Sequence, residues 1–70
     1  MQNSKSSKFV YVVVELPFCN PVSCYSSSAK AAMAVARLNL MSRERYHKAV
    51  ENLKALYGPT EYEFRRFTVL

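Results

Sequence analysis

The chain has 70 residues, enough for one small domain with a modest core, which excludes a multidomain protein. Ten lysines and arginines against five glutamates give a formal net charge of +5, which indicates an acidic partner or simply keeps the protein soluble. Two cysteines are too few for a disulfide-rich secreted domain, and no apolar run is long enough to cross a bilayer, so we expect a cytoplasmic protein.

The amino end divides into a polar stretch and a strand. Residues 1–7, MQNSKSS, lack periodicity and are predicted to be a flexible basic tail before a single domain over 8–70. Residues 8–16, KFVYVVVEL, are rich in valine and aromatics and predict a strand that Pro17 ends. Val12 and Val14 share the expected core face. Phe9 and Tyr11 lie on the other face, which must be covered by the chain or by a partner.

A connection with two prolines follows over residues 17–27, PFCNPVSCYSS. It is unusually apolar for a loop, because it carries Phe18, Val22 and Tyr25. Long loops in compact domains are often functional. Two alternatives stay open: the segment folds under the domain as core, or it forms a short hairpin arm.

Two helices are predicted next. Residues 28–41 are alanine-rich and therefore strongly helix-forming. Their apolar residues form two opposite faces, so this helix is either sandwiched in the core or shared with a partner. One face holds Ala29, Ala32, Met33, Ala36 and Leu40, and the other holds Ala31, Ala34, Val35 and Leu38.

The second predicted helix covers residues 42–58, SRERYHKAVENLKALYG. Ser42 can cap its amino end, and Gly58 followed by Pro59 is a helix stop. Its apolar face consists of Tyr46, Ala49, Val50, Leu53, Leu56 and Tyr57. The alternative is one long bent helix with Ser42 in its interior. We favour two helices, because the apolar stripe changes phase between the segments.

Residues 60–70, TEYEFRRFTVL, predict a second strand. Tyr62 and Phe64 alternate, but they are out of phase with Phe67 and Val69, which a β-bulge at Arg65–Arg66 would reconcile. The expected fold is thus a small single α+β domain of order β-α-α-β, with two helices packed on a two-stranded antiparallel sheet. Its open edges invite dimerisation or a partner strand. The expected core is Val12, Val14, Met33, Ala36, Val50, Leu53 and Phe64.

Few residues suggest catalysis or metal binding. Cys19 and Cys24 are expected to be reduced and structural, with a disulfide or half a metal site as the alternatives. His47 is the sole histidine, aspartate is absent, and one glycine excludes a glycine-rich phosphate loop. We therefore expect no enzyme activity, no cofactor and no obligatory metal.

The sequence favours a small non-enzymatic regulator or inhibitor that docks stoichiometrically on a larger protein or nucleoprotein assembly, a class that includes phage-encoded proteins. The predicted partner-binding residues are aromatic anchors with a basic rim: Phe9, Tyr11, Phe18, Tyr25, Lys30, Arg37, Arg43 and Arg45. The alternative is a module that binds RNA or single-stranded DNA through Arg43, Arg45, Arg65 and Arg66. The third reading is a purely structural homodimer subunit.

Overall fold

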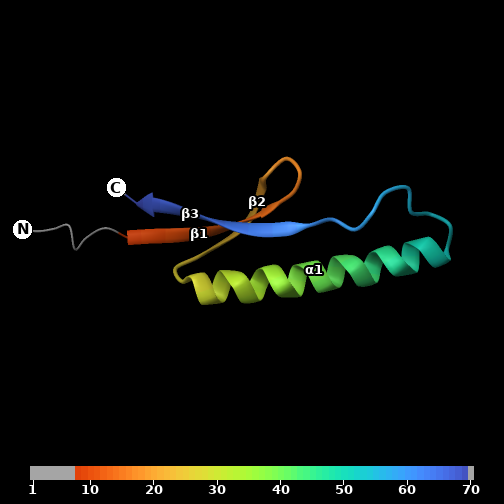
Figure 1. Ribbon diagram of the computed structural model, residues 1–70, viewed down its shortest axis with the longest axis horizontal. Helices are drawn as coiled ribbons and strands as arrows, with labels where there is room; N and C mark the ends of the chain where they lie inside the picture. The colour runs from red at the N-terminus through yellow and green to blue at the C-terminus, as the bar shows by residue number, and fades with distance from the viewer. Residues whose placement is uncertain (1–7, 70) are drawn as a thin grey trace, which may run out of the picture.

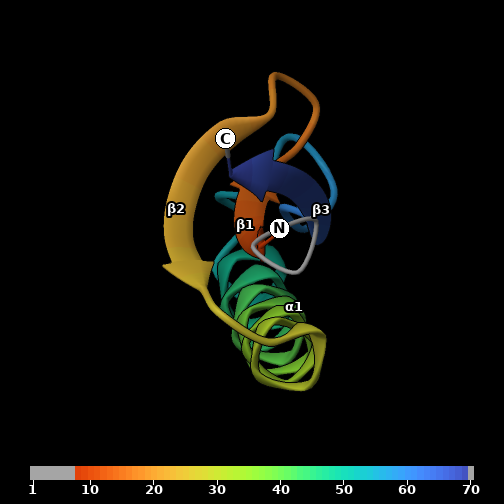
Figure 2. The ribbon, with the colours of Figure 1, turned by 90° about the vertical axis from the view of Figure 1, so that its left-hand side faces the viewer.

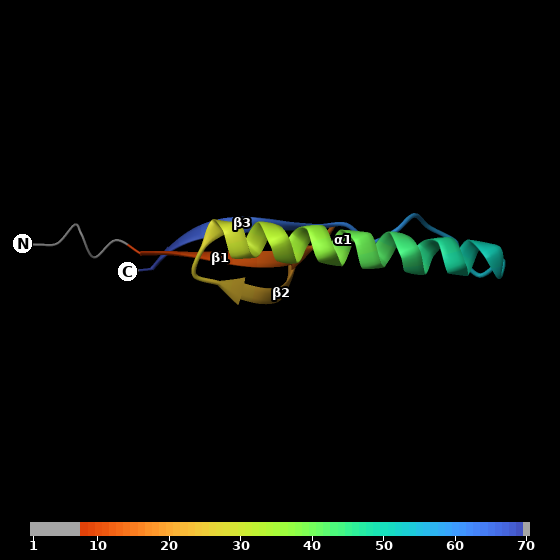
Figure 3. The same ribbon diagram turned by 90° about the horizontal axis from the view of Figure 1, so that it is seen from below.

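The computed structural model describes residues 8–69, so the predicted tail at 1–7 lies outside the described residues. The elements follow the order β1 (Lys8–Glu15), β2 (Asn20–Tyr25), α1 (Ser28–Glu51) and β3 (Tyr62–Val69). The strands form one antiparallel sheet in the order β2-β1-β3. The first part of α1 lies along one face of this sheet, and its second part extends past the strands beside the segment that returns to β3, as Figure 1 and the view from below in Figure 3 show.

The predicted arrangement of two helices on a two-stranded sheet is wrong, because the 17–27 segment supplies a third strand. A turn over residues 16–19, in which Cys19 has φ 57°, folds β2 back onto β1. Of the two alternatives for this segment, the hairpin is the observed one. Pro21 is tolerated because β2 is an edge strand, where the missing N–H can face solvent. Figure 2 shows how β2 curves beside β1.

The predicted break at Ser42 is also wrong, since α1 is one helix. Ser27 caps its start by accepting a hydrogen bond at Oγ from the Lys30 N–H at 3.1 Å. Ser42 is buried in the middle of the helix, which ends at the Asn52 cap well before Gly58. Leu56 and Tyr57 therefore lie beyond the helix and are exposed.

The stripe of α1 that is least exposed explains this continuity. It runs unbroken at three- and four-residue spacing through both predicted helices, and comprises Ala31, Val35, Leu38, Ser42, Tyr46 and Ala49. Ser42 lines a pocket with Ala49, Tyr57 and Thr60, so this part of the stripe faces the segment that leads to β3. The apparent change of phase came from counting residues of the opposite face as core.

The bulge predicted in the last strand is absent, because β3 pairs with β1 in regular register from Lys8↔Val69 to Glu15↔Tyr62. The change of phase does not need a bulge, since Phe67 and Val69 are exposed and burial does not set their face. The irregularity lies instead between β1 and β2 at Val13/Val14. Val22 is the extra residue there, since Val13 pairs with Ser23 and Val14 with Pro21.

The core is much smaller than expected. Among residues 8–69 the buried apolar residues are Val13 and Ala31, both 0% exposed, and Val14, 4% exposed. Of the predicted core, Val14 is buried and Val12 and Phe64 are half-buried, whereas Met33, Ala36, Val50 and Leu53 are exposed. Val13 is fully buried as well, although it lies on the face of β1 opposite the expected core face of Val12 and Val14. Half of the large apolar side chains in residues 8–69 are exposed.

Candidate functional site

The outer side of β3 begins with an unusual pair of hydrogen bonds. The Tyr62 N–H donates to Asn39 Oδ1 at 2.8 Å, and Asn39 Nδ2 donates to the Tyr62 carbonyl at 3.2 Å. On the opposite side of the same segment, the Leu16 N–H donates to the Glu61 carbonyl at 2.9 Å. The Tyr62 peptide groups therefore point away from β1, and the Asn39 amide bonds them as a neighbouring strand would.

The alternation of an antiparallel ladder extends this result along β3. If Tyr62 directs its N–H and C=O away from β1, every second residue after it does the same. Phe64, Arg66 and Thr68 thus present their peptide groups at the outer edge of the sheet, because β3 has a neighbour on one side only. We call these three residues the β3 edge. Within residues 8–69, no backbone hydrogen bond outside the strand ladders involves them.

Aromatic and charged side chains accompany the β3 edge. The Arg66 guanidinium carbon lies 4.4 Å from the ring centroid of Phe9, a cation–π contact on the same face of the sheet. The rings of Phe64 and Tyr11 meet edge to face at 6.0 Å. Arg65 points to the other face, where its Nε lies 2.7 Å from Glu63 Oε2. Arg66 is therefore the arginine of this pair without an ion-pair partner among the described residues.

The Tyr62 side chain shares one sheet face with Glu15. Its hydroxyl donates to Glu15 Oε2 at 3.4 Å. Burial raises the pKa of Tyr62, the negative charge of Glu15 raises it further, and the positive charge of Arg45 in α1 opposes both. The same sheet face carries the fully buried Val13.

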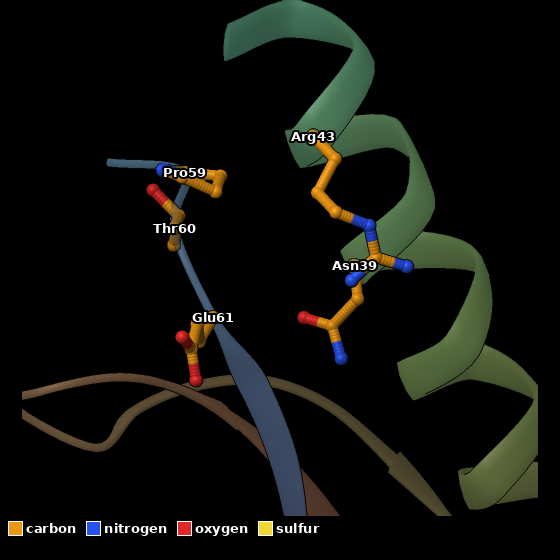
Figure 4. A pocket seen from close by; sticks show the side chains of 5 residues that line it. All are labelled: Asn39, Arg43, Pro59, Thr60 and Glu61. Carbon is orange, nitrogen blue, oxygen red and sulfur yellow. The ribbon is translucent and has the colours of Figure 1, made fainter. Parts of the chain in front are cut away.

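A polar pocket of about 240 Å³ adjoins the Asn39–Tyr62 hydrogen bonds. Asn39 and Arg43 reach into it from α1, opposite Pro59, Thr60 and Glu61 of the segment before β3 (Figure 4). The lining includes neither a cysteine nor a histidine, the usual nucleophile and base. Its polar side chains are those of Asn39, Arg43, Thr60 and Glu61.

Comparison of the chain with models of protein families, with curated proteins and with solved structures finds no significant match. The function must therefore be argued from the residues alone. Within residues 8–69, no three metal-ligating side chains come together. The described helix lacks an apolar stretch sufficient to cross a membrane. Cys19 and Cys24 are free thiols, one in the turn and one on β2.

Three of the four predicted aromatic anchors lie close together in the sheet, and Phe18 lies apart from them. Tyr11 pairs directly with Tyr25 across β1 and β2, and Phe9 follows on the same face of β1. Phe18 is 82% exposed in the turn at the opposite end of the strands. The predicted rim is spread along α1, since Lys30 and Arg37 are exposed on it while Arg43 lines the polar pocket.

Sequence reasoning missed Asn39, and a signal for it existed. Asn39 is half-buried and lies next to Leu38, at the border of the least exposed stripe of α1. A polar side chain at such a position needs a hydrogen-bond partner, because burying an unpaired amide is costly. An asparagine among alanines, valine and leucine could therefore have been assigned a structural or binding role.

The outer face of α1 is an exposed apolar surface. We use this term for Ala29, Ala32, Met33, Ala36 and Leu40, one of the two helix faces recognised in the sequence. Met33 is 64% and Leu40 53% exposed, while the opposite face carries the buried Ala31. The structure thus leaves this face without a partner among the described residues.

The four arginines proposed for nucleic-acid binding do not form one surface. Arg43 and Arg45 are two residues apart in α1 and so lie on opposite sides of the helix. Arg65 and Arg66 are successive residues of β3 and point to opposite faces of the sheet.

This dispersion makes weak nucleic-acid binding the expected result. We expect any gel shift of single-stranded RNA or double-stranded DNA at low salt to vanish by about 0.15 M salt, because few phosphates can be neutralised at once. Titrating both probes against salt checks this. Tight binding that persists at that salt concentration, and falls equally on replacing Arg43 and Arg66 with alanine, would contradict it.

Proposed function

We propose that this chain is a non-enzymatic binding module that docks stoichiometrically on a larger protein or nucleoprotein assembly and regulates or blocks it. The observation that carries the proposal is the imbalance of its apolar side chains. Twelve large apolar side chains are exposed, whereas three apolar residues are buried among those described. A chain that covers so little of its own apolar surface gains stability when a partner covers the rest.

The outer face of α1 is the surface that supports this proposal most directly. Its alanines allow a partner to approach the helix closely, and Met33 and Leu40 supply apolar contacts between them. Lys30 and Arg37 flank this face and would steer the approach of an acidic surface more than they would add affinity. An amphipathic helix presented in this way is a recurrent protein-recognition element.

Replacing both Met33 and Leu40 with glutamine tests the proposal. We expect the free energy of unfolding to change by less than about 0.5 kcal/mol, because both side chains are already in water. The stoichiometric complex, measured by cross-linking in the producing cells followed by mass spectrometry, should fall at least tenfold. The matched control replaces Leu53 and Leu56, exposed apolar residues beyond the end of α1, with glutamine and should retain the complex.

Two results would contradict the proposal. One is an unchanged complex in the double glutamine variant, which would show that the outer face of α1 does not bind the partner. The other is a large loss of stability in that variant together with a concentration-dependent dimer in sedimentation, which would show that a second copy already covers this face. The second result would favour a structural homodimer.

A further inference from the structure

The two edges of the sheet differ in how open they are. β2 carries Pro21, which lacks an N–H, and its register with β1 is interrupted between Val13 and Val14. Prolines and bulges are devices that blunt an edge strand against pairing. β3 has neither over its eight residues and runs in regular register with β1. The open edge of this protein is therefore on β3.

Asn39 limits this opening to one end of β3. Its amide already bonds both peptide groups of Tyr62, so an added strand cannot use that residue without displacing a side chain. The next three outward-facing residues form the β3 edge: Phe64, Arg66 and Thr68. They offer three N–H donors and three C=O acceptors over about 13 Å of strand. This length suits a short extended segment.

A second copy of the chain fits this edge poorly. In a symmetric antiparallel dimer, the two-fold axis places one residue of β3 directly opposite its own copy, and the two side chains point to the same face. The symmetric register that pairs all three residues of the β3 edge centres on Arg66, and like charges directly opposite each other repel. Registers shifted toward the amino end need the peptide groups of Tyr62, which are already hydrogen-bonded to the Asn39 side chain. A shift toward the carboxyl end leaves Phe64 without a described partner.

The charges point to a foreign strand instead. Glu63 neutralises Arg65 on one face, whereas Arg66 on the other face has no ion-pair partner among residues 8–69 and rests on Phe9. The position opposite Arg66 therefore favours a carboxylate. We infer that the β3 edge adds an extended segment of another protein that carries an acidic residue opposite Arg66. This inference rests on the proposed function and names the class of partner.

Amide exchange and a peptide titration test it. In the free protein, we expect the amides of Phe64, Arg66 and Thr68 to exchange rapidly. Those of Glu63, Arg65 and Phe67 should be protected by β1, and that of Tyr62 by Asn39. The probe is the acetylated and amidated peptide TVTVEVTVT, whose palindromic order fits either strand direction. Saturation followed by NMR should protect Phe64, Arg66 and Thr68. We expect this peptide to bind about tenfold more tightly than TVTVKVTVT.

The variants assign the charge preference to one residue. Arg66→Glu should invert the preference between the two peptides, and Arg66→Ala should abolish it. Arg65→Ala is the matched control, because the neighbouring arginine points to the other face, and it should keep the preference. An unchanged preference in both Arg66 variants overturns the inference.

Two further outcomes overturn it. No protection of the three amides at saturating peptide would show that the edge does not add a strand. Protection in the free protein, with a dimer in sedimentation, would show that a second copy occupies it. Loss of the cellular complex in the Met33 and Leu40 double variant, alongside either outcome, would retain the proposed function and remove the β3 edge from it.

Discussion

Replacing Asn39 with leucine should lower the free energy of unfolding by about 2–3 kcal/mol, because two hydrogen bonds are lost and both Tyr62 peptide groups are left unpaired beside an apolar side chain. Chemical denaturation measures this loss. Asn39→Asp should lose less, since the carboxylate still accepts from the Tyr62 N–H but no longer donates to the carbonyl. Asn52→Leu is the matched control, because the Asn52 side chain bonds an exposed Lys48 carbonyl, and it should cost about 0.5–1 kcal/mol.

The same substitution should lengthen the open edge of the sheet. Without the Asn39 amide, the Tyr62 N–H has no partner, and its exchange with water should accelerate at least tenfold while that of Glu63 stays slow. The freed peptide groups extend the run available for strand addition, so we also expect more self-association at high concentration. Unchanged exchange at Tyr62 in the leucine variant would show that Asn39 does not close this end of β3.

The sequence predicted those elements whose residues determine their own conformation. The run of valines in β1 and the alanines at the start of α1 belong to this class. β1 was predicted with nearly the observed bounds and the first helix with the observed start at residue 28, but the end of the helix was not predicted. The antiparallel pairing of β1 with β3 followed from the segments between them. The sequence did not decide whether the segment that forms β2 is a hairpin strand or part of the core. Pro21 and a turn with a left-handed Cys19 give only loop signals in a sequence.

The errors share one physical cause, which is the assumption that apolar residues are buried. Met33, Val50 and Leu53 were assigned to the core on periodicity. A different stripe of α1 is the less exposed one, which leaves Met33 and Val50 exposed, and Leu53 lies beyond the end of the helix. The same assumption produced the bulge at Arg65–Arg66. The β3 edge could not be predicted either, because its limits depend on a hydrogen bond between Asn39 and Tyr62, residues far apart in sequence.

Ser42 distinguishes the observed helix from the two predicted ones. In the structure Ser42 is interior to α1 and buried, so Ser42→Pro should cost about 3 kcal/mol or more by removing a helical hydrogen bond and clashing with the preceding turn. Ser28→Pro is the matched control. Ser28 follows the Ser27 cap as the first helical residue, where proline is well tolerated, and its stability should hardly change.

Ser42→Ala should change stability in opposite directions for two helices divided at Ser42 and for one continuous helix. If Ser42 capped a second helix, losing its hydroxyl would lower stability by about 1 kcal/mol. Inside a continuous helix, alanine has the higher helix propensity and removes a buried polar group, so stability should be unchanged or rise by about 0.5 kcal/mol. Thermal unfolding followed by circular dichroism measures both variants. A destabilised alanine variant together with a tolerated proline would mean that the helix divides at Ser42.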